Sequence, residues 1–70
     1  MNGIHFKLTT EFIELFKLLK ATGLCESGGA AKHAVSQSRV EVDGKVELRR
    51  GFKVRPGMRI DFSGRQILVE

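Results

Sequence analysis

The stretch from residue 27 to residue 57 reads SGGAAKHAVSQSRVEVDGKVELRRGFKVRPG. Ser27 is a candidate N-cap for a helix over residues 28–37, because its hydroxyl can accept a hydrogen bond from a free amide of the first turn. Two glycines at the start make this helix intrinsically weak, so packing against a neighbour must hold it. The predicted inner face is small, which requires close packing, and comprises Ala31, Ala34 and Val35.

The second part of this stretch predicts a tight β-hairpin. Apolar and polar residues alternate on both sides of Asp43-Gly44. An Asp-Gly pair adopts the positive φ angles of a type I′ turn, whose twist suits a two-residue loop between antiparallel strands. The pattern therefore predicts two short strands whose apolar positions are Val40, Val42, Val46 and Leu48.

The segment before residue 27 predicts one strand and one helix. Residues 3–8 alternate in the manner of a short edge strand. Thr9 and Thr10 are candidate N-caps for a helix that ends near Ala21, where Gly23 can take the left-handed conformation of a helix stop. The apolar stripe of this helix is predicted to comprise Phe12, Leu15, Phe16 and Leu19.

The segment after the hairpin predicts further strands. Phe52 and Val54 are expected to face the core, whereas Lys53 and Arg55 project to the other side, since strand residues alternate. Two last strands, MRIDF and QILVE, flank Ser63-Gly64. The fold class is therefore α+β: a single domain over residues 1–70, with two packed helices followed by a small, mostly antiparallel sheet. All five phenylalanines are predicted to be core residues: Phe6, Phe12, Phe16, Phe52 and Phe62.

The excess of positive over negative charge is confined to one half of the chain. The sequence has 12 Lys and Arg against 8 Asp and Glu, a net charge of +4. Residues 1–31 are balanced, so the whole excess lies in residues 32–70. Such an asymmetry favours a surface that faces a polyanion, with solubility as the plain alternative. The lone Cys25 and the absence of a signal-like or membrane-length apolar run lead us to expect a cytoplasmic protein with no membrane partner.

The order and spacing of these features resemble the S4 RNA-binding domain. The resemblance covers residues 12–62 and is carried by three groups of residues. Ser27, Ala31 and Lys32-His33 match in the helix, and Pro56-Gly57 matches in the following turn. The matching hairpin residues are Arg39, Val40, Val42, Asp43, Gly44, Lys45 and Val46. The segments LLKATGL, SGGAAKHAV and RRGFKVRPG are similar in particular to the short stand-alone S4-like bacterial proteins of the YbcJ type.

This resemblance implies an S4-like αL-motif fold and RNA binding without an attached catalytic domain. Four positions depart from the family pattern. Ala30 replaces a usual acid, Ser38 replaces the glycine that normally ends the helix, and Glu41 replaces a basic strand residue. The fourth departure is Met58, where the family usually has Asp.

Two clusters are the candidate RNA contacts. The first turn of the helix over residues 28–37 exposes amides at the positive end of its dipole, and its glycines let the backbone approach a phosphate; the alternative is that they only allow two helices to pack. The basic run after the hairpin supplies guanidinium groups, which bind phosphate with two parallel hydrogen bonds and stack on bases. The predicted RNA-binding residues are Ser27, Gly28, Gly29, Lys32, His33, Arg39, Lys45, Arg49, Arg50, Lys53 and Arg55.

These features predict a non-catalytic, monomeric protein that binds structured RNA, with ribosomal RNA as one candidate. Without Tyr or Trp, a single-strand binder built on aromatic stacking is disfavoured. No cofactor is expected, and no metal either, since no His, Cys and acidic residues have ligand spacing. One alternative is a small protein-interaction adaptor with a basic surface. Another is the RNA-binding half of an enzyme whose catalytic half is a separate protein partner, for instance in an RNA-processing complex.

Overall fold

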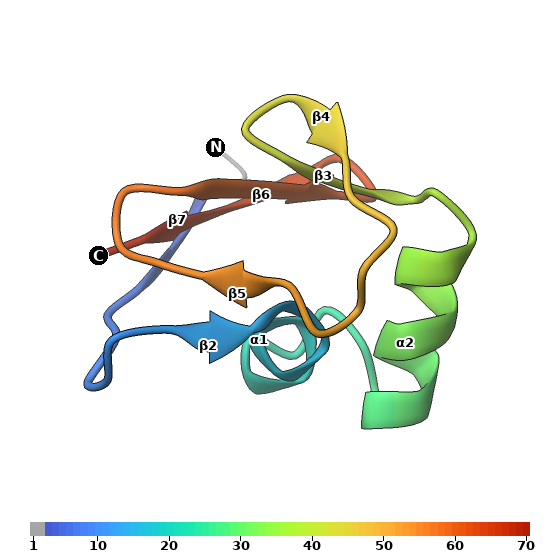
Figure 1. Ribbon diagram of the computed structural model, residues 1–70, viewed down its shortest axis with the longest axis horizontal. Helices are drawn as coiled ribbons and strands as arrows, with labels where there is room; N and C mark the ends of the chain where they lie inside the picture. The colour runs from blue at the N-terminus through green and yellow to red at the C-terminus, as the bar shows by residue number, and fades with distance from the viewer. Residues whose placement is uncertain (1–2) are drawn as a thin grey trace.

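The structure is a computed structural model that describes residues 3–70, and it contains two helices and seven strands there. The chain runs through these elements in an order that alternates short strands with the two helices (Figure 1). They are β1 (Gly3–Phe6), β2 (Ile13–Glu14), α1 (Leu15–Ala21), α2 (Gly28–Ser36), β3 (Val40–Val42), β4 (Lys45–Val46), β5 (Lys53–Val54), β6 (Arg59–Phe62) and β7 (Arg65–Val69).

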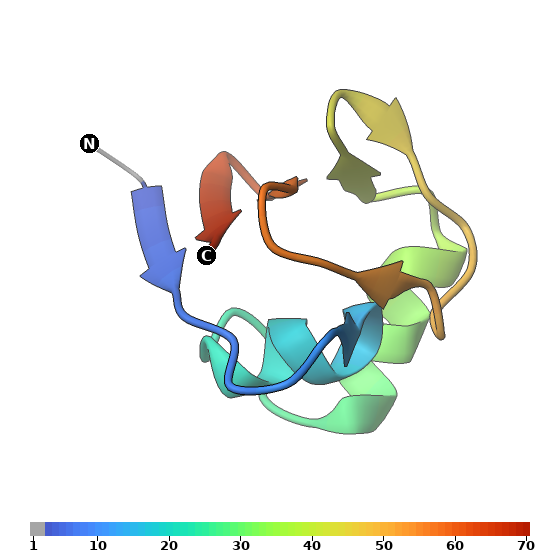
Figure 2. The same cartoon turned by 60° about the vertical axis from the view of Figure 1, so that its left-hand side comes forward.

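The strands form one five-stranded sheet and one two-stranded ribbon. The order in the larger sheet is β1-β7-β6-β3-β4, with β1 parallel to β7 and the other neighbours antiparallel. The ribbon pairs β2 with β5. Both helices lie on the same side of the larger sheet, and in the ribbon β2 leads directly into α1 with β5 alongside it (Figures 1 and 2). The predicted α+β class with two packed helices and a mostly antiparallel sheet is confirmed, as is the edge position of the first strand.

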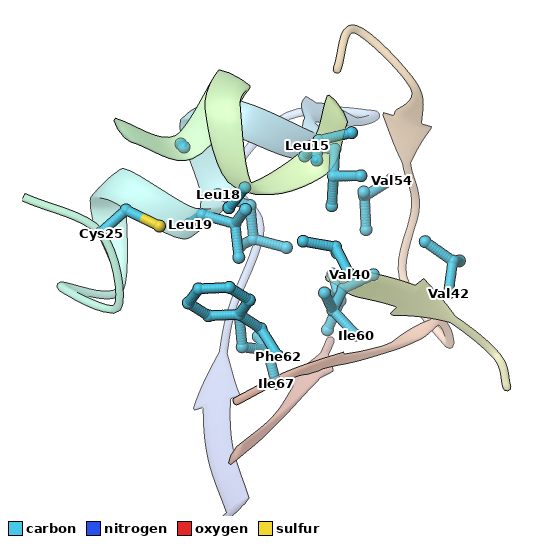
Figure 3. Close-up of a cluster of buried hydrophobic side chains, with 14 residues drawn as sticks. Leu15, Leu18, Leu19, Cys25, Val40, Val42, Val54, Ile60, Phe62 and Ile67 are labelled. Carbon is cyan, nitrogen blue, oxygen red and sulfur yellow. The ribbon is translucent and has the colours of Figure 1, made fainter. Parts of the chain in front are cut away.

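The core fills the space between the helices and the sheet (Figure 3). The inner face of α2 is buried as predicted, through Ala31, Ala34 and Val35. These small side chains let α2 pack closely against α1, because little volume separates the two backbones. The fully buried larger side chains are Leu15, Leu18 and Leu19 of α1, Val35 of α2, and Val40, Val54, Ile60 and Ile67 of the strands.

The start of α1 differs from the prediction. Residues 13–14 are not helical but pair with β5, with Ile13 opposite Val54, and the N-cap is Glu14 in extended conformation, so neither Thr9 nor Thr10 caps the helix. The apolar spacing of residues 12–19 predicts a helix, but pairing of residues 13–14 with the distant strand β5 overrides this local propensity. As a result Phe12 lies outside the helix and is 36% exposed, so the prediction that every phenylalanine is a core residue is wrong for Phe12.

The Asp-Gly turn is confirmed, with φ of +50° at Asp43 and +86° at Gly44. However, the two-residue loop pairs Val46 with Glu41, so Val46 shares the outer face of the sheet and is 50% exposed. The prediction that Val46 and Leu48 are inward apolar positions is therefore wrong, since a register set by the turn fixes which face each residue takes. Glu47 is the residue that this register turns toward the core side.

The C-terminus of α2 is closed by a Schellman arrangement around Ser38. The Arg39 amide donates to the Ala34 carbonyl (3.2 Å), and the Ser38 amide donates to the Val35 carbonyl (3.1 Å). Ser38 consequently takes a φ of +63°, in the left-handed region where glycine is favoured. The side chain at this position therefore strains the backbone.

We predict that Ser38→Gly stabilises the protein by up to about 1.6 kcal/mol. Glycine removes a left-handed strain of roughly 1–2 kcal/mol but gives back roughly 0.4–1 kcal/mol through the freedom of the unfolded chain. The matched control is Gln37→Gly, where φ is −90°, so only the second effect applies and destabilisation is expected. Denaturant unfolding measures both changes, and equal destabilisation by the two glycines would contradict the strain at Ser38.

Candidate nucleic-acid interface

The N-terminus of α2 is capped as predicted. The Ser27 hydroxyl oxygen accepts a hydrogen bond from the Ala30 amide at 3.1 Å. A Cβ built at Gly28 would lie 3.9 Å from the Phe16 ring, and one at Gly29 would lie 3.9 Å from the Ser27 hydroxyl. Both distances are ordinary contacts, so helix packing requires neither glycine. This weakens the reading in which the two glycines serve only helix packing.

The run from Arg49 to Arg55, here called the basic segment, is fixed against the start of α1 by its own backbone. The Leu15 amide donates to the Phe52 carbonyl at 2.9 Å, and the Phe16 amide donates to the Arg50 carbonyl at 3.1 Å. The N-cap residue of α1 makes no side-chain capping bond. Carbonyl groups of the basic segment therefore satisfy amides that a helix start leaves without an internal partner.

Phe16 connects the two predicted clusters. Its amide donates to the Arg50 carbonyl, its ring lies within 3.9 Å of where a Cβ at Gly28 would be, and the centre of the ring lies 4.8 Å from the Lys32 ammonium nitrogen. The Lys32 side chain is exposed and so is that of Arg50. The chain between β4 and β5 runs beside the helices in both views (Figures 1 and 2). The structure thus brings the start of α2 and the basic segment together around one aromatic ring.

The outer side of the β2–β5 ribbon carries the other two cations of the basic segment. Lys53 and Arg55 are exposed on either side of the buried Val54, as predicted. The Lys53 ammonium nitrogen lies 5.0 Å from the centre of the Phe12 ring, and the Arg55 guanidinium carbon lies 5.6 Å from it. Sequence reasoning missed Phe12 as a surface residue, because only the pairing of β2 with β5 distinguishes it from a helical core position.

Arg49 is held by Glu47, a partner that sequence reasoning also missed. The Arg49 Nε donates to Glu47 Oε2 at 2.9 Å, Nη2 donates to Oε1 at 3.3 Å, and the backbone amide donates to Oε2 at 3.0 Å. The Arg49 side-chain hydrogen bonds lower the pKa of Glu47, against an opposing effect of burial. The hydrogen bond to Glu47 likewise raises the pKa of the Arg49 guanidinium. One edge of the Arg49 guanidinium is therefore already occupied.

Three predicted contacts lie away from Phe16 or make no contact with it. Arg39 follows the C-terminal end of α2, where its guanidinium carbon lies 5.5 Å from the Phe62 ring. Lys45 is in β4, the edge strand of the larger sheet, at the end of the molecule away from the helices (Figure 1). His33 is exposed on α2, one residue beyond Lys32. The structure therefore does not bring Arg39 and Lys45 into the cluster around Phe16.

Cys25 is buried in the core. Burial raises the pKa of its thiol, an effect that the nearby Arg39 partly offsets. A thiol of this kind is inert rather than nucleophilic. Within residues 3–70, no three His, Cys, Asp or Glu side chains lie close enough together to hold a metal ion. No helix in that same part of the chain is long and apolar enough to cross a membrane.

We predict that Glu47→Gln destabilises the protein at neutral pH and that this difference shrinks in acid. Because the pKa of Glu47 is lowered in the folded state from 4.5, its contribution is complete above pH 4.5 and is lost as the pH falls through the lowered value. Denaturant unfolding over a pH series measures the difference. In an Arg49→Gln background the destabilisation by Glu47→Gln should depend much less on pH. If it depends on pH as strongly as before, Arg49 is not the cause of the lowered pKa of Glu47.

Comparison with known proteins places this arrangement in a family. The family model of the S4 domain matches residues 6–70. YbcJ of Escherichia coli (strain K12), named for a proposed RNA-binding activity, is 42% identical over 57 residues, which is 81% of each chain; YbcJ of Shigella flexneri matches to the same extent. The solution structure of E. coli YbcJ, reported to reveal an αL motif involved in RNA binding, superposes with a TM-score of 0.74 at 38% identity and covers 99% of this chain and 89% of that one. The chain belongs to the S4 domain family.

Proposed function

We propose that the protein binds structured RNA, without catalysing a reaction on it, through the surface formed by the first turn of α2 and the basic segment. The observation that carries this proposal is the convergence on Phe16 of Lys32, the backbone of Arg50 and the glycine-containing start of α2. The αL motif reported as involved in RNA binding in E. coli YbcJ supports it. Ribosomal RNA is one candidate target.

The chemistry of this surface suits recognition of an RNA backbone. Free amides at the start of α2 lie at the positive end of the helix dipole, which favours a phosphate. Exposed cations stand beside them on backbone that hydrogen bonds hold in place, so less side-chain and loop ordering is needed on binding. Contacts to phosphates position a protein on RNA and recognise the shape of a helix rather than its sequence. The proposed phosphate-facing residues are Ser27, Gly28, Gly29, Lys32, Arg50, Lys53 and Arg55.

The remaining predicted RNA contacts are additional or peripheral in this proposal. His33 adjoins Lys32 on the exposed side of α2 and can add a hydrogen bond to phosphate. Arg39 and Lys45 lie outside the Phe16 cluster, so we propose them as peripheral contacts that only a long RNA helix reaches. A cytoplasmic location, a monomeric state and a separate catalytic partner stay predictions.

A protein-interaction adaptor is the second candidate, and one observation favours it. Val46 is 50% exposed and Leu48, two residues further along the chain, is 59% exposed. Exposed apolar side chains of this kind are more typical of protein contacts than of phosphate contacts. Binding through them would depend weakly on salt, which distinguishes the two candidates.

We predict that the triple variant Lys32→Ala, Arg50→Ala, Lys53→Ala loses most of its affinity for a labelled RNA hairpin. Each phosphate contact contributes about 0.7–0.9 to the slope of log K against log salt, because binding releases condensed counterions. The slope should therefore fall by roughly two units in the variant. Fluorescence anisotropy at several salt concentrations, with a DNA duplex as competitor, measures affinity and slope together.

The matched control removes the same charge elsewhere: Lys20→Ala, Arg59→Ala, Arg65→Ala. All three side chains are exposed, and either triple lowers the net charge from +4 to +1. The control should keep most of the affinity. Equal loss in both triples would mean that net charge alone drives binding, and salt-independent binding unchanged in both would favour the adaptor.

A further inference from the structure

A hollow of about 350 Å³ opens beside β5. It is lined by Arg49, Gly51, Phe52 and Lys53, all of the basic segment. The volume is near the lower end of the ~300–1,000 Å³ range of small-molecule sites, and Gly51 contributes no side chain to fill it. The hollow therefore offers the Phe52 ring and the side chains of Arg49 and Lys53 to a single small, flat ligand.

Arg49 differs from the other cations of the basic segment because one edge of its guanidinium is already hydrogen-bonded to a carboxylate. Two of its guanidinium nitrogens already donate to the Glu47 carboxylate, whose side chain is only 14% exposed. That edge is not available for a bidentate phosphate contact, and the carboxylate compensates the charge. The Arg49 side chain is nevertheless 74% exposed, and its guanidinium carbon lies 5.2 Å from the centre of the Phe52 ring.

A guanidinium held in this way is suited to stacking. Unpaired bases in RNA stack on aromatic rings and on the planes of Arg guanidinium groups. Glu47 fixes the orientation of the plane before any ligand arrives, so little side-chain freedom is lost on binding. The Glu47 side chain is itself placed by the hairpin register, through the hydrogen bond from its amide to the Val40 carbonyl at 3.0 Å.

We propose that this hollow accepts one unpaired nucleobase of the bound RNA, stacked on the Arg49 plane beside Phe52, with Lys53 placed for a phosphate of the same strand. The proposal rests on the RNA binding proposed above and adds a defined feature of the RNA, an unpaired nucleotide next to a helix. Stacking is tolerant of base identity, so the site selects for the presence of a base more than for its type.

This role separates Arg49 from its neighbours in a measurable way. Removing a stacking contact lowers affinity for an unpaired base and leaves the salt slope unchanged, whereas removing a phosphate contact lowers the slope by about 0.7–0.9. Arg49→Lys, which keeps the positive charge beside Glu47, should therefore keep the salt slope of the unchanged protein. Arg50→Ala should lower the slope and keep the preference for a base.

The experiment compares two RNA hairpins with the same stem and the same phosphates. One has a loop of adenosines, and the other has the same loop with abasic nucleotides. The unchanged protein should prefer the first by about 5- to 150-fold, the range expected for stacking of one base. Arg49→Ala and Arg49→Lys should both abolish this preference; the lysine keeps the charge but has no plane to stack on.

Arg59→Ala is the matched control. The Arg59 Nε donates to Asp61, two residues away, at 3.1 Å, so it is also an acid-paired arginine, but it lies on β6 rather than in the basic segment. The control should keep the full preference, and denaturant unfolding should show that each variant is folded.

Salt-sensitive binding of both hairpins with equal affinity would overturn the nucleobase site and leave the proposed RNA binding intact. A preference that persists in Arg49→Ala would also overturn it, because the base would then be recognised elsewhere. Failure of the unchanged protein to bind either hairpin at low salt would overturn the site together with the proposed function.

Discussion

Two amides at the start of α1 donate to carbonyl groups of the basic segment, and the arrangement of the proposed surface depends on these bonds. A helix start leaves its first amides without internal partners, and here no side-chain cap supplies one. The carbonyls of Phe52 and Arg50 take that role. The same two hydrogen bonds therefore satisfy the first amides of the helix and fix the backbone of the basic segment at Phe52 and Arg50.

Phe16 extends this constraint to α2. Its amide makes one of the two bonds, its ring faces the position where a Cβ at Gly28 would be, and the Lys32 ammonium lies over the ring. The cation–π contact is worth only about 0.5–1 kcal/mol at an exposed site, so its importance is positional rather than energetic. In the proposed binding mode, a polyanion would meet the start of α2 and the basic segment as one surface.

Features encoded locally could be predicted from the sequence, and features that depend on distant pairing could not. The Ser27 cap, the small inner face of α2, the Asp43-Gly44 turn and the outward direction of Lys53 each follow from neighbouring residues, and each is confirmed. Phe12 was misplaced because its segment pairs with a strand far along the chain. The partnership of Glu47 with Arg49 was missed although the turn register implies which way Glu47 faces, since the alternation of valines was followed instead.

The most direct test of the account is an NMR titration of the isotope-labelled protein with an RNA hairpin at low salt, read residue by residue from the backbone amides. Binding at the proposed surface predicts shifts that concentrate at Gly28, Gly29, Lys32, Arg50 and Lys53 and that fade as salt is added. Amides of β4 and of the outer face of β6 should change little. Shifts confined to β4 and its neighbour Leu48, or no shift anywhere at RNA excess, would contradict the claim that the start of α2 and the basic segment form an RNA-binding surface.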